Sequence, residues 1–440
     1  MKISLLTRGA LAAIVAAVGL GIEAAPTQAT TQTAAQSQAA AETSGSVDRA
    51  AIRPGGPLVA RKQSSVPARP PVSSMTSAEC RALSARVRAG KAKAAGYCVG
   101  IDALQSPGSS AEQKALRTRV ARAISQRALP AECGMTSDSS GTWWAQGRRN
   151  ACNHVRYGLS VIIVNTGQVI GTAVFHSINT MSASGTRWNT TNFTWVWSWT
   201  GVGFPEYATG GMFGCPGCLA STTSWTHPVF DEWRGTGYYD APALATGAKI
   251  NVSGGFWEIT FGSSKYGTPP AVTFSLYTAQ SRCDNAIGNR TPGCVFGNIA
   301  GLIGFSQGSY PDFVWHVYQA QLSGLPGRMS TGTYLKRLSN STLVAANGSK
   351  ACPSSIPRPT GMQCDEYPFR STYQGASTGG GVARSFPWCK MPDPQRTGST
   401  GWSRCFIPSS QNLGAGGVLG GFYSNERILD GDLFQIGYTS

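Results

Sequence analysis

Two adjacent carboxylates and one asparagine near the C-terminus are the side chains best suited to chemistry. The segment Cys364 to Phe369 places Asp365 and Glu366 directly before a Tyr-Pro step, and Asn412 precedes a glycine-rich run. Carboxylates can act as general bases, and carboxylate and amide oxygens are ligands that Mg²⁺ and Mn²⁺ prefer. Composition alone, however, favours solvated turn residues and a flexible loop at these positions.

The local sequence also restricts the backbone around these residues. Pro368 fixes its own φ and biases Tyr367 toward an extended conformation, so we expect the acid pair on a strand end or a stiff loop. On an extended backbone the two carboxylates point to opposite faces and share one site only if the strand ends or bulges there. One is therefore expected to be catalytic and the other supporting. Asn412 is either a helix N-cap or a ligand of a hard cation.

These motifs and their order resemble the NucA/NucB family of secreted bacterial deoxyribonucleases, over about residues 334–438. The family's Asp-Glu-aromatic-Pro-hydrophobic motif is matched by Asp365 to Phe369, and its Asn-x-Gly-Ala-Gly motif by Asn412 to Gly416. Lys336 and Arg337 are a weaker match to an upstream basic element. The resemblance implies a small α+β domain that hydrolyses DNA with the help of Mg²⁺ or Mn²⁺.

Hydrolysis of a phosphodiester requires a base to activate water and a cation to neutralise charge on the phosphate. All four histidines lie upstream of the resembling segment, so an aspartate is expected to be the base, as in the family: they are His154, His176, His227 and His316. The resemblance implies Asp365 as general base and Asn412 as metal ligand. Glu366 is expected to be a supporting ligand or to orient the base.

Two arginines of the same segment are candidates for contact with the substrate. Arg370 and Arg404 can contact DNA phosphates, and the alternative for each is an exposed salt bridge. Residues 317–440 hold eleven Lys and Arg against six Asp and Glu, a net charge of +5. Glu426 is expected to be a surface residue rather than a ligand, because it lies about 20 Å from Asn412 along a continuous helix.

The chain divides into segments of different composition. Residues 1–25 have a basic start, an apolar stretch and small residues at the end, which predicts a signal peptide and secretion, with an uncleaved anchor as the alternative. We expect a disordered leader or linker at 26–75, a basic helical pro-region or linker at 76–132, an all-β domain at 133–320 and the deoxyribonuclease domain at 321–440.

Twelve cysteines, an even number, predict disulfides and an oxidising compartment. Proximity in sequence predicts Cys80–Cys98, Cys133–Cys152, Cys215–Cys218 and Cys283–Cys294, with two bridges among Cys352, Cys364, Cys389 and Cys405. A zinc or redox motif is the less favoured alternative for the 215–218 pair.

Most of the formal net charge of +16 lies before the β-rich segment. Residues 45–132 hold fifteen Lys and Arg against five Asp and Glu, a net charge of +10, and residues 77–94 and 110–128 have helical patterns. This stretch could be a DNA-holding arm, a propeptide or a solvated helical pair. We favour a pro-region or linker, because no base-reading motif accompanies the charge.

Alternating runs rich in Val, Ile, Thr and Trp predict a β-sandwich or barrel for the middle domain. The expected strands are 159–164, 171–175, 193–199, 249–261, 271–277 and 313–319, the last containing His316 as a structural histidine. Trp195, Trp197 and Trp199 share one strand face and are either core or a stacking platform, with core favoured. The alternative function is therefore a secreted β-sandwich module that binds carbohydrate or polymer and carries an inactive nuclease-like tail.

Overall fold

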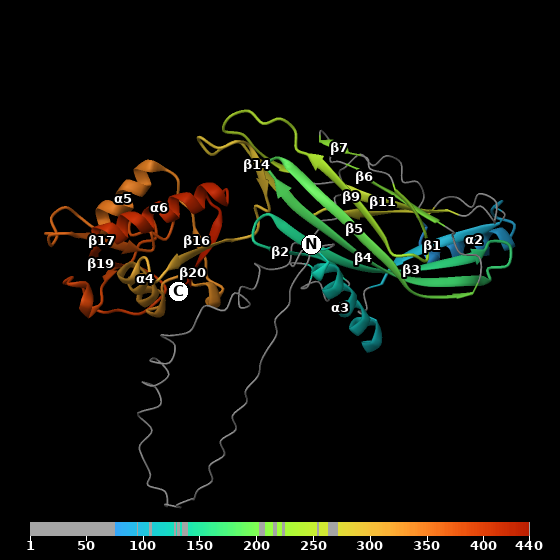
Figure 1. Ribbon diagram of the computed structural model, residues 1–440, viewed down its shortest axis with the longest axis horizontal. Helices are drawn as coiled ribbons and strands as arrows, with labels where there is room; N and C mark the ends of the chain where they lie inside the picture. Colours follow the sequence, from blue (N-terminus) through green and yellow to red (C-terminus); the bar gives the residue numbers. More distant parts are fainter. Residues whose placement is uncertain are drawn as a thin grey trace, which may run out of the picture. The chain divides into compact units, whose positions relative to one another are not determined.

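Figure 1 shows the fold in a computed structural model. The structure describes residues 75–94, 96–104, 108–126, 129, 133, 140–201, 207–213, 218–221, 225–252, 255–262 and 272–439. All of them belong to one compact unit, Val47–Ser440. The predicted signal peptide and the leader up to residue 74 lie outside the described residues. Within the described part, no helix is long and apolar enough to cross a membrane.

The first described segment combines two helices with a strand. α2 (Ser77–Arg88) begins with a reciprocal capping box between Thr76 and Glu79. β1 (Tyr97–Ala103) pairs antiparallel along its whole length with β3 of the large middle sheet, and α3 (Ser110–Ser125) follows it. We propose that this segment is an integral part of the folded protein and not a removable pro-region, because β1 is an edge strand of that sheet.

The middle of the chain is mostly β-structure, arranged in three sheets. The largest has the order β1-β3-β4-β5-β9-β7 with β2 paired to β3; the others have the orders β12-β11-β6-β8 and β10-β13-β14. A two-residue turn joins β4 to β5, and Gly185 in this turn has a φ of +61°, which suits glycine. The strands are β2 (Ser140–Gln146), β3 (Asn150–Ile163), β4 (Val169–Ser184), β5 (Arg187–Gly201), β6 (Tyr207–Phe213), β7 (Leu219–Ser221), β8 (Trp225–Pro228), β9 (Trp233–Asp240), β10 (Lys249–Val252), β11 (Phe256–Gly262), β12 (Val272–Tyr277), β13 (Ser281–Asp284) and β14 (Gly293–Val295).

An aromatic core lies between the seven-stranded and the four-stranded sheet. The ring centroid of Phe175 on β4 is 5.3 Å from that of Phe261 on β11, and Trp233 on β9 packs against both rings. The run 249–261, expected as one strand, is two strands in different sheets, because Gly254 and Gly255 interrupt its side-chain pattern.

The three tryptophans of β5 do not share one environment. Trp195 is buried at 3% exposure beneath α3, Trp197 is half-buried, and Trp199 is 56% exposed and packs on Phe230. The core interpretation therefore holds for Trp195 and is wrong for Trp199. The expectation that the three share one face is also wrong, because a bulge at Trp197 shifts the register: Trp195 pairs with His176 on the α3 face, whereas Trp199 pairs with Ala173 on the face of the aromatic core.

A buried polar network joins α3 to the sheet. Glu112 of α3 accepts hydrogen bonds from Arg156 at 2.6 Å, and it lies 2.9 Å from Nε2 of His176. Nδ1 of His176 lies 2.8 Å from Nε2 of His154. A neutral His176 that donates to Glu112 and accepts from His154 satisfies every one of these contacts. Burial lowers the pKa of His176 from 6.5 to about 4, although the Glu112 carboxylate opposes this shift.

Mild acid should therefore destabilise the protein. The unfolded chain binds a proton at this histidine below about pH 6.5, whereas the folded chain does not until about pH 4, so the unfolding free energy falls as pH decreases through that window. The limiting slope for one proton is about 1.4 kcal/mol per pH unit. Urea unfolding at pH 7, 6 and 5 should show this loss, and His176→Gln should flatten it. Equal stability of the unmodified protein at pH 7 and 5 would contradict the expectation.

The C-terminal part is α+β, with two three-stranded sheets of order β15-β20-β16 and β17-β19-β18. β15 and β20 pair in parallel, so strands distant in sequence lie side by side (Figure 1). The elements are β15 (Gly301–Ser306), α4 (Pro311–Leu322), η4 (Met329–Thr331), β16 (Leu335–Lys336), α5 (Ser341–Ala351), β17 (Met362–Tyr367), β18 (Ala383–Arg384), η5 (Pro387–Cys389), β19 (Trp402–Pro408), α6 (Ser409–Asn425) and β20 (Leu433–Thr439).

The strand expected at residues 313–319 is wrong, because these residues form the middle of α4. Phe313, Val317 and Ala320 are buried at helical spacing, and Pro311 occupies the first helical turn, where its missing N–H costs nothing. The short alternation of apolar and polar residues in this run also fits a helix with one buried side.

The core of the C-terminal part begins before residue 320. Ile303 and Phe305 of β15 and Phe313 of α4 pack in one cluster with residues of β17, β19, α6 and β20. The boundary expected at residue 320 would separate β15 and most of α4 from the rest of this cluster. We therefore propose a boundary near residue 300.

Five disulfides are present among the described residues: three match the specific pairings expected from sequence proximity, and the other two lie among the four C-terminal cysteines, whose pairing the sequence left open. They are Cys80–Cys98, Cys133–Cys152, Cys283–Cys294, Cys352–Cys364 and Cys389–Cys405. The predicted Cys215–Cys218 bridge involves Cys215, which lies outside the described residues. Cys352–Cys364 joins the end of α5 to β17, and Cys389–Cys405 joins η5 to β19.

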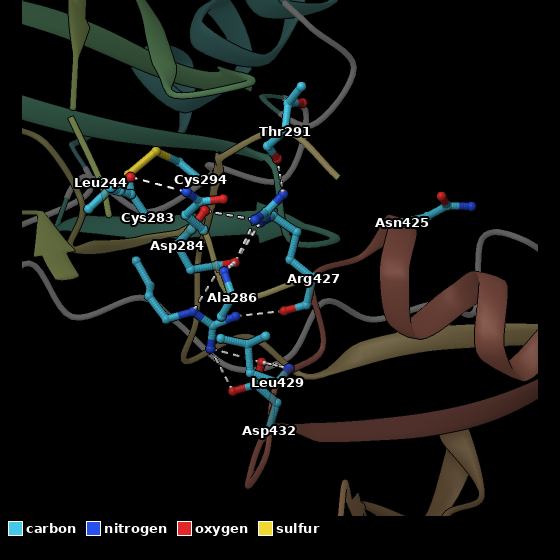
Figure 2. A network of polar contacts seen from close by, with 12 residues as sticks. Leu244, Cys283, Asp284, Ala286, Thr291, Cys294, Asn425, Arg427, Leu429 and Asp432 are labelled. Atoms are coloured by element: carbon cyan, nitrogen blue, oxygen red, sulfur yellow. Dashed lines mark hydrogen bonds and ion pairs between the residues drawn. A yellow bond between two sulfur atoms is a disulfide. The ribbon is translucent and has the colours of Figure 1, made fainter. Parts of the chain in front are cut away.

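Buried ion pairs link the segment after α6 to the β-rich part, as Figure 2 shows. Arg427 donates to Asp284 of β13 at 2.5 Å, and Arg282 donates to Asp432 at 2.7 Å. Arg148 donates to the same carboxylate at 2.7 Å. Separating the C-terminal part from the β-rich part would leave these charges without their partners, which is energetically costly. The network therefore stabilises the contact between the two parts.

Candidate active site

A cleft of about 1200 Å³ lies between α5, β17 and α6. Of the residues expected at the site, it brings together Asp365, Glu366, Asn412 and Arg370. Arg404 is not among the lining residues. The other lining residues used below are Arg358, Gln363, Gly416 and Gly420.

The strand β17 positions both carboxylates. It pairs antiparallel with β19, so that Asp365 lies opposite Cys405 and Glu366 opposite Arg404. β17 ends at Tyr367, and the following peptide bond to Pro368 is cis. The expectation that the acid pair lies at a strand end is correct. Both side chains line one cleft because β17 is the edge strand of its sheet and the cleft runs along that edge.

A buried histidine, His316, forms a hydrogen bond with the carboxylate of Asp365. Nδ1 of His316 lies 2.6 Å from Oδ2 of Asp365, and Nε2 lies 3.0 Å from Oγ of Ser403. His316 is 0% exposed and Asp365 only 4%. The Ser403 hydroxyl lies closer to Nε2 than to the Tyr367 carbonyl, 3.3 Å away, so we assign its hydrogen to Nε2. Nδ1–H then donates to Oδ2 of Asp365, and Oδ1 remains as a second acceptor.

This contact corrects one premise of the sequence analysis. His316 precedes the resembling segment, yet α4 carries it into the same core, so the domain does contain a histidine. It is not among the residues that line the cleft, and both of its ring nitrogens are engaged. The expectation that it is a satisfied structural histidine is correct, and its partner is the carboxylate assigned as base.

Glu366 is half-buried beside the Cys352–Cys364 disulfide, whose Cys352 sulfur lies 3.8 Å from Oε2. Burial raises the pKa of Glu366 to about 8, and the neighbouring Asp365 charge adds to the shift, while Arg370 opposes it. Asp365 and Glu366 therefore lie next to each other in different environments. Asp365 is paired with His316, whereas the positive charge near Glu366 does not offset its burial.

Asn412 is not the N-cap of its helix. Pro408 occupies that position, and Asn412 lies at the end of the first turn of α6, because the chain becomes helical at Ser409. Nδ2 of Asn412 donates to Oε1 of Gln363 on β17 at 3.0 Å. The amide is thereby oriented, and its carbonyl oxygen is the atom that remains for a cation.

The glycines of the second motif have different structural roles. A Cβ at Gly414 would lie 2.7 Å from the Tyr310 ring at the start of α4, so this position requires close approach of the two helices. Gly416 and Gly420 lie one and two turns beyond Asn412, on the face of α6 that lines the cleft, and a Cβ there would meet no atom within 4 Å. They leave the helix backbone open to a bound molecule.

Matched alanine substitutions should separate these roles. Gly414→Ala should lower the unfolding temperature, because overpacking usually costs about 1–3 kcal/mol. Gly416→Ala should raise it, because alanine is favoured over glycine in a helix by about 1 kcal/mol and has free space here. Thermal unfolding of the two variants tests both signs. A stabilised Gly414→Ala would contradict the close packing against Tyr310.

The arginines occupy distinct places. Arg370 is exposed at the cleft, as is Arg358, which the sequence analysis did not single out. Arg404 instead donates to Asp393 at 2.6 Å and 2.8 Å and to the Ala351 carbonyl. Arg404 therefore forms a salt bridge, as in the alternative, but this pair is mostly buried rather than exposed, and the guanidinium does not line the cleft.

Residues 331–437, which supply both carboxylates and Asn412, match the family model described as deoxyribonuclease NucA/NucB. The match lies in the C-terminal region, where the sequence showed the resemblance. No curated protein and no solved structure matches the chain. The match confirms the resemblance seen in the sequence and indicates a nuclease whose substrate is DNA.

The residues that match the family model do not include the whole hydrophobic core of the C-terminal part. β15 and α4, with His316 and the Phe305 and Phe313 rings, precede residue 331. The sequence analysis missed His316 and Ser403 as partners of Asp365. A helical reading of residues 311–322 would have placed His316 on the apolar side of an amphipathic helix, and that was the available signal.

Proposed function

We propose that the protein is a secreted, metal-dependent endonuclease that hydrolyses DNA with little sequence preference. The observation that supports this most strongly is the cleft itself, where Asp365, Glu366 and Asn412 converge within the NucA/NucB domain. Five disulfides fit an oxidising compartment, which supports secretion. The binding-module alternative is not favoured, because an inactive nuclease-like tail would not need these three residues to lie in one cleft.

The donor atoms fit a hard cation that keeps part of its water shell. Among the described residues, no group of three or more His, Cys, Asp or Glu could hold a metal ion by itself. The Asn412 carbonyl oxygen and the Glu366 carboxylate are hard oxygen donors, and Mg²⁺ or Mn²⁺ can be held by one or two such groups with waters. When bound, such a cation would neutralise charge that develops on the phosphate.

The side chains suggest a division of roles in hydrolysis. Asp365 accepts a proton from the attacking water through Oδ1, while His316 holds Oδ2 and fixes the orientation of the carboxylate. His316 is thus a positioning residue. Gln363 orients the Asn412 amide in the same way. Arg370 and Arg358 are exposed at the cleft, which supports a role for both in contacting phosphates of the bound DNA.

Cation dependence and one matched pair of variants test this assignment. We expect plasmid DNA to be cleaved with Mg²⁺ or Mn²⁺ and to remain intact in excess EDTA. Asn412→Ala should raise the cation concentration that gives half-maximal activity by about ten-fold or more. Asn425→Ala removes the same group from the other end of α6 and should leave that concentration unchanged. No cleavage by folded protein with either cation would refute the proposed activity.

A further inference from the structure

One face of the large sheet carries exposed basic side chains on α2 and α3. Both helices pack on the same face of β3: α3 on the cluster around Cys152 and α2 on the cluster around Ile162. Alternate residues of β3, such as Tyr157 and Leu159, point to the opposite face and into the aromatic core. Both helices therefore lie on the outer side of the sheet.

The outward side of α3 is purely cationic. Leu116, Val120 and Ala123 are buried, while Lys114, Arg117 and Arg122 are exposed on the opposite side of the helix. No described acidic side chain forms an ion pair with any of these three cations. The only acid of this helix, Glu112, is buried and already neutralised by Arg156.

Helix α2 extends this cationic layer. Arg81, Arg86 and Arg88 are exposed, and the single acid of the helix region, Glu79, is engaged in the capping box at Thr76. Within the described residues, none of the three arginines forms an ion pair. Packing against the sheet holds these cations, and those of α3, at fixed spacing.

The parts of β3 on which the two helices pack lie about one turn of duplex DNA apart. Ten residues of β3 separate Cys152 from Ile162, which corresponds to roughly 33 Å at about 3.3 Å per residue. One turn of B-DNA is about 34 Å long. Phosphates one turn apart on the same side of a duplex can therefore meet α2 and α3 together.

We propose that the basic face formed by α2 and α3 binds the DNA backbone and holds long DNA for the cleft to cut. This rests on the proposed function for its choice of ligand and for the cleavage that the face would serve, whereas the binding itself is independent of cleavage. The contacts are ionic, so binding has no base preference and weakens steeply with salt. Arg119 is not part of the face, because it pairs with Glu232 at 2.5 Å and lies over the Trp195 ring.

Charge-neutralising variants test the basic face separately from catalysis. The test triple is Lys114→Gln, Arg117→Gln and Arg122→Gln. The control triple removes three exposed cations elsewhere: Lys249→Gln, Lys390→Gln and Arg396→Gln. Affinity for a 40-base-pair duplex is measured at several salt concentrations in EDTA, and cleavage is compared on plasmid and on a 10-base-pair duplex. Circular dichroism checks that each variant is folded.

The test triple should bind the long duplex about 10- to 100-fold more weakly at 50 mM salt than the unmodified protein. The slope of log affinity against log salt should be smaller by about 2–3. Plasmid cleavage should fall, while cleavage of the short duplex stays unchanged. The control triple should behave like the unmodified protein.

Two results would overturn the proposal. One is unchanged DNA affinity of the folded test triple, and if heparin binding is lost in that case, the face belongs to another polyanion. The other is an equal loss of DNA affinity in the control triple. The binding measurement is independent of activity, so a protein that binds DNA through this face and cuts nothing would refute only the proposed function.

Discussion

Replacing Asp365 by asparagine should reduce the rate of DNA cleavage by about 10²- to 10⁴-fold, the range that a general base usually contributes. Asparagine keeps the shape of the side chain and an oxygen that accepts from Nδ1 of His316. It cannot take up a proton from water at neutral pH. The unfolding temperature should therefore stay close to that of the unmodified protein, and single-turnover cleavage of a labelled duplex should show the loss.

The matched control is Asp393→Asn, which makes the same change in the same domain. Asp393 pairs with Arg404 outside the cleft lining, so this variant should cleave DNA at nearly the original rate. If folded Asp365→Asn retains full activity, the base lies elsewhere, and Glu366→Gln becomes the variant to examine. Loss of activity together with loss of folding in Asp365→Asn would show a structural role instead.

Removing the chain before residue 331 should abolish folding of the C-terminal domain. A fragment 331–440 contains the whole family match but lacks β15 and α4. It would expose the core surface that Phe305, Phe313 and Val317 cover, all of them 3% exposed or less. Loss of one large core side chain typically costs about 3–5 kcal/mol, which alone approaches the total stability of a domain of this size.

The matched fragment, 297–440, restores both elements and should fold and cleave DNA. Circular dichroism, thermal unfolding and plasmid cleavage compare the two. We expect a cooperative transition only for the longer fragment, at a lower temperature than for the full chain, because Arg427 and Asp432 lose their partners in the β-rich part. A folded and active 331–440 fragment would refute the assignment of β15 and α4 to this core.

The candidate site was predictable from sequence where it depends on local motifs. Asp365, Glu366 and Asn412 belong to the two sequence motifs that pointed to the site, and all three line one cleft. Pro368 correctly indicated that a strand ends next to the acid pair. The partner of Asp365 was not predictable in this way. His316 is 49 residues from it in sequence, and its contact depends on the packing of α4.

For the fold too, features that depend on neighbouring residues were predictable from the sequence, and contacts between distant residues were not. Strand patterns correctly indicated a mostly β middle region, since alternation of side chains is a local property. The parallel pairing of β15 with β20 joins residues more than 130 positions apart and has no local signal. Arg404 pairs with Asp393, eleven residues away, and the sequence did not decide between this ion pair and a contact with DNA.

The disulfides at the cleft have a consequence for the cell that makes the protein. Cys352–Cys364 anchors the strand that carries both acids, and Cys389–Cys405 anchors the neighbouring strand β19. Each closes a loop of a length for which a disulfide contributes roughly 3 kcal/mol, and neither forms readily in a reducing cytosol. If the protein is the exported nuclease proposed above, its cleft would therefore become fully stabilised only after export, and DNA inside the producing cell would be exposed to a less stable form of the domain.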